Sequence, residues 1–317
     1  MLQHARVDSG GLTLVPEQAP PRLTFDANRF EPMRVMPVHH NLEHHSLLQL
    51  PALVEVAQRL DGVCTIRFHD DRAAVNTSFV NAPTSNPVAG RPDEIVRSIE
   101  SAHAWLAILE VQHDPAYRAL LDEVLENVRP VIERKDPHMT YFGADIFVAS
   151  PGAVTPYHMD HNHGFILQVR GKKLLYVAEP LDREVVSERS LELFHGTGSR
   201  ELVVYREEFD ARANKFNLEP GLGGYMPSTA PHWVKNGDNV SITISFTFYT
   251  DGLRRRKLLH RGNHSLRRLG LKPSPVGQSP LKDGVKYAAF RALFRAVDSV
   301  QRLRGREVAD LTRYYSS

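Results

Sequence analysis

The chain of 317 residues contains a single cysteine, Cys64, and no long apolar run. One cysteine excludes an internal disulfide and any site built from several thiolates. The sequence predicts no transmembrane helix, because no stretch of about 18 or more consecutive apolar residues occurs. The N-terminal segment also lacks the apolar core of a signal peptide, from which we expect a cytoplasmic protein.

The composition is that of a globular protein, with 42% hydrophobic and 24% charged residues, but its charges are unevenly distributed. Residues 1–252 contain 23 Lys/Arg and 33 Asp/Glu, whereas residues 253–306 contain 15 and 2. We interpret the basic segment as one that packs on its own acidic body. Nucleic-acid binding is disfavoured, because no helix-turn-helix, zinc-finger or RNA-binding pattern accompanies the charge.

The N-terminal region, residues 1–137, has mixed helical and strand character. Helical periodicity in residues 47–60 is interrupted early by Pro51, and two helices broken near Asp114 follow between Pro92 and about Arg134. Residues 62–69 predict a short strand and residues 75–92 a loop.

Between about residues 138 and 250 the segments become short and rich in β-formers. Two such segments flank Gly171 and Lys172, which predicts a two-residue hairpin. Residues 240–249 alternate apolar and hydroxyl side chains, which is typical of a strand with one apolar face and one polar face. Several strands of this kind indicate a jelly roll or sandwich. The charged residues 181–215 interrupt the pattern and are predicted to be an insertion.

The candidate metal site consists of His158, Asp160 and His232. His158 and Asp160 are two positions apart, so in a strand they share a face and can meet one ion. His232 begins a later strand, after a turn. Two histidines and one carboxylate form the facial triad, which leaves adjacent positions open on iron(II). A second step of this type, His69-Asp70-Asp71, is interpreted as the charged end of a strand.

Lys173 is the candidate anchor for an anionic cosubstrate. In a two-residue hairpin Arg170 and Lys173 oppose each other, and counting back by twos from Arg170 reaches Asp160 and His158. An unbroken strand would therefore direct Lys173 into the space that holds the metal ligands. Its ammonium suits the distal carboxylate of 2-oxoglutarate, to which Thr155 is placed to add a hydrogen bond.

The stretch TPYHMDHNHGFILQVRGKK, followed by PHWVKNG and an alternating strand, resembles the jumonji-C/cupin-like hydroxylases, including the asparaginyl hydroxylase branch. In that family a Thr-Pro-x-His-x-Asp step is followed, at this spacing, by Gln-x-x-Gly-x-Lys. The resemblance covers about residues 140–250. It implies a mainly β core, the double-stranded β-helix or jelly roll of cupin/jumonji-C type, with α-helical N-terminal and C-terminal additions. We therefore expect a catalytic core over residues 138–252 and a basic helical segment over residues 253–317.

The resemblance also implies the roles of the site residues. His158, Asp160 and His232 would bind iron(II), and Lys173 and Thr155 would bind the carboxylate of 2-oxoglutarate. Enzymes of this type use O2 to couple oxidative decarboxylation of 2-oxoglutarate to succinate with hydroxylation of a C–H bond. The expected function is therefore that of a dioxygenase acting on an amino-acid, peptidyl or carrier-bound substrate.

Two departures from the asparaginyl branch bear on how the cosubstrate lies. Gly164 stands where that branch has an asparagine, and Ser245 replaces an asparagine on the last strand, so that Ser245 becomes a candidate cosubstrate-binding residue. His161 and His163 are additional histidines. We interpret them as residues around the site or on the surface rather than as substrate contacts.

The C-terminal segment from Gly284 to Arg304 is predicted to be an amphipathic helix. One face of this helix carries an apolar, largely aromatic stripe whose exposure to water would be unfavourable. The stripe consists of Tyr287, Phe290, Phe294, Val297 and Val300. Jumonji-type hydroxylases often dimerise through C-terminal helices, and we predict a homodimer interface here. In the competing interpretation the stripe packs on the chain's own jelly roll.

Two other functions remain open. A non-enzymatic or differently metallated cupin that binds a small molecule would keep the three ligands without needing Lys173. Residues 40–44, His-Asn-Leu-Glu-His, spell the inverted zinc-protease step. That chemistry requires both histidines on one helix, and Pro51 follows too closely for a long ligand helix.

Overall fold

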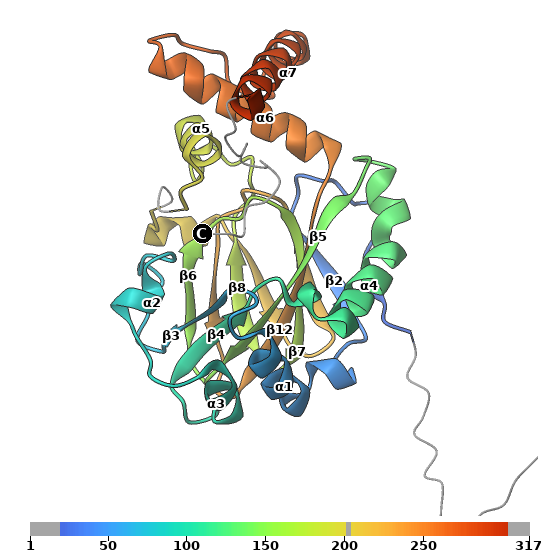
Figure 1. Cartoon of the computed structure of the whole chain (residues 1–317), viewed down its shortest axis with the longest axis vertical. Coiled ribbons are helices and arrows are strands. Elements are labelled where there is room, and N and C mark those ends of the chain that lie inside the picture. The colour runs from blue at the N-terminus through green and yellow to red at the C-terminus, as the bar shows by residue number, and fades with distance from the viewer. Residues whose placement is uncertain (1–19, 201–203, 304–317) are drawn as a thin grey trace, which may run out of the picture.

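The computed structural model describes residues 20–200 and 204–303, and two antiparallel β-sheets form its centre (Figure 1). The larger sheet has eight strands in the order β1-β2-β10-β7-β12-β5-β4-β3, and the smaller has four in the order β6-β11-β8-β9. The strand bounds are β1 Leu23–Thr24, β2 Met36–His40, β3 Ile66–Asp70, β4 Ala104–Ile108, β5 Thr140–Ala149, β6 Val154–His158, β7 His163–Arg170, β8 Lys173–Val177, β9 Asn214–Leu218, β10 Leu222–Met226, β11 His232–Asn236 and β12 Ser241–Tyr249.

Seven α-helices and three short 3₁₀ turns lie in the described part of the chain. The helices are α1 Leu50–Leu60, α2 Ala82–Ser85, α3 Pro92–Arg97, α4 Pro115–Glu133, α5 Glu188–Thr197, α6 Asp251–Arg268 and α7 Pro280–Leu303. The 3₁₀ turns are η1 Ser46–Leu48, η2 Val111–His113 and η3 Glu207–Ala211.

Strands β5 to β12 form a jelly roll. Along the chain they alternate between the two sheets, except at β8 and β9, which are neighbours in the smaller sheet. The predicted fold class, a mainly β jelly roll with helical additions at both ends, is confirmed. The residues between β8 and β9 carry α5 and η3, where an insertion was predicted.

The predicted hairpin at Gly171 and Lys172 is wrong. Strand β7 pairs with β10 and β12, whereas β8 pairs with β9 and β11, so the two segments belong to different sheets. Gly171 has a φ of +73°, and a Cβ there would lie 2.3 Å from the carbonyl oxygen of Val240. This sharp corner therefore requires glycine, and it carries the chain from one sheet to the other.

The N-terminal region holds a strand that the sequence pattern did not reveal. Strand β4 lies within the stretch predicted as two helices, and it pairs with both β3 and β5. All five of its residues are buried, so it lacks the alternation that marks a half-exposed strand. Pro51 does not interrupt α1 but lies in its first turn, where no intrahelical N–H is required.

The two faces of β12 have different neighbours. Its apolar side chains, among them Ile244 and Phe246, share one buried cluster with residues of α1 and α4, and both helices lie on the outer side of the larger sheet in Figure 1. Its hydroxyl side chains point between the sheets, where Ser245 and Thr247 line a cavity. The alternation in the sequence thus separates the helix-packed core from the polar interior of the jelly roll.

Helices α6 and α7 lie together at one end of the molecule (Figure 1). Phe290 of α7 packs so closely on α6 that a Cβ at Gly262 would lie 2.2 Å from its ring. Tyr287 and Phe294 are covered by the guanidinium groups of Arg255 and Arg261, at 4.7 and 4.6 Å from the ring centroids. The three aromatic rings of the stripe therefore pack within their own chain, on α6 rather than on the jelly roll, and are not free for a dimer interface. Val297 of the stripe is exposed, and the side chain of Val300 lies outside the part of the chain that the structure describes.

Basic side chains of α6 make contacts inside the chain. Arg267 pairs with Glu192 of α5, Arg254 pairs with Asp251, and the Lys257 ammonium lies 5.4 Å from the ring of Tyr249. These contacts agree with the interpretation of the basic segment as one that packs on its own body. Among the described residues, no helix is long and apolar enough to cross a membrane.

Candidate metal centre

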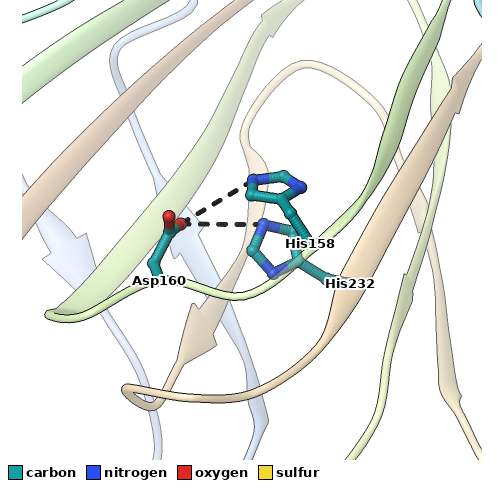
Figure 2. A group of neighbouring side chains, drawn as sticks. All are labelled: His158, Asp160 and His232. Atoms are coloured by element: carbon teal, nitrogen blue, oxygen red, sulfur yellow. Dashed lines mark ion pairs between the residues drawn. The ribbon is translucent and has the colours of Figure 1, made fainter. Parts of the chain in front are cut away.

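Three predicted ligands converge at one end of the smaller sheet (Figure 2). His158 ends β6, Asp160 follows two residues later, and His232 begins β11, directly opposite His158 in the strand pairing. Asp160 Oδ2 lies 4.0 Å from His158 Nε2 and 3.8 Å from His232 Nε2. Within the described residues this is the one group of three or more potential ligands whose donor atoms all lie within 4.8 Å of one another.

Both histidine rings are oriented by backbone carbonyls. His158 Nδ1 lies 2.8 Å from the carbonyl oxygen of Pro156, and His232 Nδ1 lies 3.0 Å from that of Ala230. An N–H at each Nδ1 donates to its carbonyl, which leaves the lone pair of each Nε2 directed at Asp160. Burial, and then the neighbouring His232, hold the pKa of His158 well below its usual value, so this ring is neutral. Two imidazole nitrogens and one carboxylate form a donor set that fits iron(II).

Asp160 has a cationic neighbour that the sequence pattern did not reveal. The Arg200 guanidinium Nη2 lies 3.3 Å from Asp160 Oδ1. Burial favours the neutral carboxyl, but the nearby positive charge of Arg200 outweighs it and holds the pKa of Asp160 below its usual value. Asp160 is therefore an ionised carboxylate, the form that binds a metal.

The six predicted site residues line a single cavity of about 60 Å³ between the two sheets. Further residues lining it come from β3, β4, β5 and the segments around Phe79 and Arg200. The lining is Arg67, Phe79, Trp105, Leu109, Asp145, Phe147, Thr155, His158, Asp160, Ile166, Lys173, Arg200, Met226, His232, Val234, Ser245 and Thr247.

Lys173 brings a buried ammonium to this cavity. Its side chain is nearly inaccessible, and burial lowers the pKa of Lys173 to about 7. In the described part of the chain no carboxylate lies within ion-pair distance of this ammonium. A buried cation without a protein counter-ion favours an anionic ligand, because the ligand would offset the cost of burying the charge.

Lys173 reaches the cavity for a different reason from the one the sequence suggested. The parity count assumed an unbroken strand from His158 to Arg170, but β6 and β7 lie in different sheets. Lys173 instead begins β8, beside β11 and opposite Asn236 in the smaller sheet that also carries both histidine ligands.

The larger sheet contributes Trp105 of β4 and Asp145 of β5 to the lining of the cavity. Trp105 Nε1 donates a hydrogen bond of 2.9 Å to Thr155 Oγ1. Asp145 of β5 accepts a hydrogen bond of 2.8 Å from the backbone N–H of Glu110, and burial raises the pKa of Asp145 to about 7. Neither Trp105 nor Asp145 was recognised in the sequence, because no motif marks them and the strand that carries Trp105 was not predicted.

The other histidine motifs do not form metal sites. His40 ends β2, outside any helix, so residues 40–44 lack the helical geometry of the inverted zinc-protease step. The His69 ring stacks on Trp105 with centroids 4.8 Å apart, while the Asp70 carboxylate binds Arg72 and Asn86. Both motifs therefore serve packing and local hydrogen bonding.

His161 and His163 are buried beside the centre rather than exposed. His161 stacks on Phe194 of α5 with ring centroids 3.8 Å apart. His163 Nδ1 accepts a hydrogen bond of 3.1 Å from the backbone N–H of Ser228. Burial lowers the pKa of each imidazole to about 3, so both rings are neutral packing residues around the site.

The fold and the site together define a jelly roll with a facial triad between its sheets. No protein-family model matches the chain, and neither does any curated protein.

Solved structures of low identity do match. One is the Escherichia coli ribosomal oxygenase YcfD, with 15% identity over 87% of this chain and 68% of that chain and a TM-score of 0.49. YcfD in complex with cobalt and 2-oxoglutarate matches with 15% identity over 88% and 68% and a TM-score of 0.46. The DMSP lyase DddQ from Ruegeria pomeroyi matches with 13% identity over 33% of this chain and 37% of that chain and a TM-score of 0.22. At this distance the matches do not assign a function, which depends on the residues of the site itself.

Proposed function

We propose that this protein is an iron(II)- and 2-oxoglutarate-dependent oxygenase that hydroxylates an amino-acid or peptidyl substrate. The observation that carries the proposal is that the triad and a buried lysine share one cavity inside a jelly roll, and that this lysine has no carboxylate counter-ion among residues 20–200 and 204–303. A cupin that only binds a metal needs the triad, but it has no use for an ammonium buried at this cost.

Each residue has a separate task. His158, Asp160 and His232 would hold iron(II) from one side and leave adjacent coordination positions open. The bound metal would supply the redox chemistry by which O2 oxidises both 2-oxoglutarate and a C–H bond of the substrate. Lys173 and Thr155 would hold the distal carboxylate of 2-oxoglutarate, so that its other end faces the triad.

The inner faces of the strands limit how the cosubstrate lies. Lys173 and Thr155 approach the cavity from the smaller sheet, and Ser245 approaches it from β12 of the larger sheet. An anion bound between them favours the protonated form of Lys173, because the ammonium then gains a counter-ion. The buried setting keeps this charge pair strong, because little water screens it.

An adjoining cavity offers a place for the primary substrate. It has a volume of about 170 Å³, and it shares Phe79 and Arg200 with the metal cavity. Its other lining residues are Val75, Asn76, Thr77, Ser78, Tyr157, Val204 and Tyr205. Hydroxyl, amide and aromatic groups of this kind suit a peptide or amino-acid side chain. Because YcfD is named a ribosomal oxygenase, ribosomal proteins are the first set of peptidyl substrates to screen.

The test is anaerobic loading with iron(II), followed by titration with 2-oxoglutarate while the metal-to-ligand charge-transfer absorption is recorded. We expect a saturable band, and succinate release above the uncoupled background when a substrate from the peptide set is present. An iron-loaded protein that develops no band at millimolar 2-oxoglutarate would favour the non-enzymatic cupin.

We also propose that the protein forms a homodimer through α7, by a face other than the one that the aromatic stripe suggested. The side of α7 turned away from α6 is aliphatic and exposed, with Leu281 79%, Val285 66% and Leu293 53% accessible. A second copy of the chain would cover this face and remove apolar surface from water.

A further inference from the structure

Arg200 joins the metal centre to the insertion between β8 and β9. It follows α5, and its side chain is 18% exposed at the metal cavity. The residue lies far from the His158–Asp160 step in the sequence, and no motif marks it.

The two oxygens of Asp160 have different neighbours. Oδ2 faces the Nε2 atoms of His158 and His232, at 4.0 and 3.8 Å. Oδ1 faces away from them, toward Arg200 Nη2 at 3.3 Å. The carboxylate therefore presents one oxygen to the metal position and the other to a guanidinium.

Arg200 is itself held in place by packing. Its guanidinium carbon lies 5.6 Å from the centroid of the Phe79 ring, and that ring stacks on His158 at 3.7 Å with an interplanar angle of 6°. Arg67 contacts the same ring at 4.6 Å and donates a hydrogen bond of 2.5 Å to the Phe79 carbonyl. Arg200 thus approaches two ligands: it pairs with Asp160 and packs on the ring that covers His158.

The positive charge of Arg200 beside the metal position is unfavourable for metal binding. A guanidinium near a metal ion repels it, so Arg200 opposes metal binding unless it performs another task. On a bound iron(II), the three ligands would leave adjacent positions open for the two oxygens of 2-oxoglutarate and for O2. A carboxylate that bound the metal through both oxygens would take one of those positions.

We propose that Arg200 is a positioning residue that holds Asp160 Oδ1 away from the metal, so that Asp160 binds through Oδ2 alone and the position for O2 stays open. This inference rests on the proposed function, and it adds a residue outside the triad to the machinery of the site. Ion pairs that orient a ligand carboxylate in this way fix its geometry and are costly to remove.

The experiment compares Arg200→Met, Arg200→Lys and a matched control, Arg206→Met. Arg206 lies on the same insertion, pairs with Glu208 and covers the Phe209 ring, but it is 65% exposed and lines no part of the metal cavity. Nitric oxide serves as the probe for the O2 position, added anaerobically to each protein with iron(II) and 2-oxoglutarate. Electron paramagnetic resonance of the high-spin nitrosyl complex measures its binding.

We expect Arg200→Met to bind nitric oxide at least roughly tenfold more weakly than the wild type, the scale seen when the outer partner of a metal ligand is removed. Arg200→Lys keeps a cation beside Oδ1 and should recover most of the binding, and Arg206→Met should match the wild type. Wild-type nitric oxide affinity in a folded, iron-loaded Arg200→Met protein would overturn the proposal. If Arg200→Met does not fold, Arg200→Gln takes its place, because its shorter side chain cannot reach Oδ1.

A second measurement separates this proposal from the proposed function. The visible absorption of the cobalt(II)-loaded proteins reports the coordination geometry without 2-oxoglutarate. A changed spectrum in Arg200→Met that Arg200→Lys restores supports the role of Arg200, even if the wild type binds no 2-oxoglutarate and the oxygenase proposal fails. Identical cobalt spectra in all four proteins contradict the role of Arg200 and leave the oxygenase proposal intact.

Discussion

The indole of Trp105 donates a hydrogen bond of 2.9 Å to the hydroxyl oxygen of Thr155, which joins β4 of the larger sheet to β6 of the smaller sheet. Because Thr155 Oγ1 accepts this bond, its own O–H is free to point to another acceptor. In the proposed enzyme that acceptor is the distal carboxylate of 2-oxoglutarate.

Trp105→Phe should therefore weaken 2-oxoglutarate binding without removing the metal site. The phenyl ring still occupies part of the buried space beside His69, but the bond that orients the Thr155 hydroxyl is lost. One neutral hydrogen bond of about 0.5–1.5 kcal/mol corresponds to a loss of affinity of roughly two- to tenfold. Titration of the charge-transfer band measures it, with iron content as the control. A variant with wild-type affinity would show that Thr155 does not depend on Trp105.

Asp160→Ala should abolish most of the iron binding. It removes one of three ligands and leaves two histidines, whose combined affinity for iron(II) is much lower. The measurement is metal analysis after anaerobic reconstitution and desalting. Asp70→Ala is the matched control, because it removes the carboxylate of the other histidine–aspartate step, which contacts Arg72 instead of a metal position. Equal iron content in wild type and Asp160→Ala would refute the assignment of the triad.

Lys173→Ala should weaken 2-oxoglutarate binding by roughly ten- to a hundredfold, because it removes a charge-assisted contact of about 1.5–3 kcal/mol. Iron content should not change, since Lys173 is not a ligand. Lys172→Ala is the control: the neighbouring lysine is 73% exposed and pairs with Glu219. Unchanged affinity in Lys173→Ala would mean that another group holds the carboxylate.

Lys173 should also make the stability of the metal-free protein depend on pH. Burial lowers the pKa of Lys173 from 10.5 to about 7 in the folded state. Between these values the unfolded chain binds more protons than the folded one, so the free energy of unfolding rises with pH, by up to about 1.4 kcal/mol per unit. Lys173→Met lacks this dependence. Its stability advantage over wild type should be largest below pH 7 and shrink toward pH 10, as followed by urea unfolding; an advantage that does not vary with pH would contradict a buried, titrating lysine.

The parts of the fold that could be predicted from the sequence are those whose two faces differ. The alternation of residues 240–249 identified β12 and its polar side, because that strand separates a helix-packed core from a polar cavity. Strand β4 is buried on both faces and offers no such contrast. The change of sheet at Gly171 was mistaken for a hairpin, because a tight glycine corner has the same local sequence in both arrangements.

The residues of the candidate site likewise divide into those that a sequence pattern marks and those that only the fold brings together. His158 and Asp160 are close in sequence, and His232 follows a recognisable turn, so the triad could be named before the structure was known. Arg200, Trp105 and Asp145 reach the cavity only through the packing of the insertion and of β4 and β5. Contacts between distant segments leave no spacing pattern in one sequence, which is why these residues were missed.

A glutamate introduced on the buried face of α7 should affect stability differently from one introduced on its exposed face. Phe290 is 6% exposed and packs on Leu259 and Val276, so Phe290→Glu should destabilise the α6–α7 pair by more than the roughly 1.5–3 kcal/mol that burial of a large apolar side chain contributes. Val285→Glu with Leu293→Glu changes only the exposed aliphatic face and should leave thermal unfolding of a monomer unaltered.

In the proposed homodimer, however, the Val285→Glu/Leu293→Glu pair would place charges in an apolar interface and dissociate the two copies. Sedimentation at micromolar concentration distinguishes the cases. A dimeric wild type that becomes a folded monomer in this double variant supports an interface on the aliphatic face. A wild type that is already monomeric refutes the dimer. A dimer that survives the double variant but is lost in Phe290→Glu would place the interface elsewhere on the α6–α7 pair, because only the buried packing that shapes the pair would then have been disturbed.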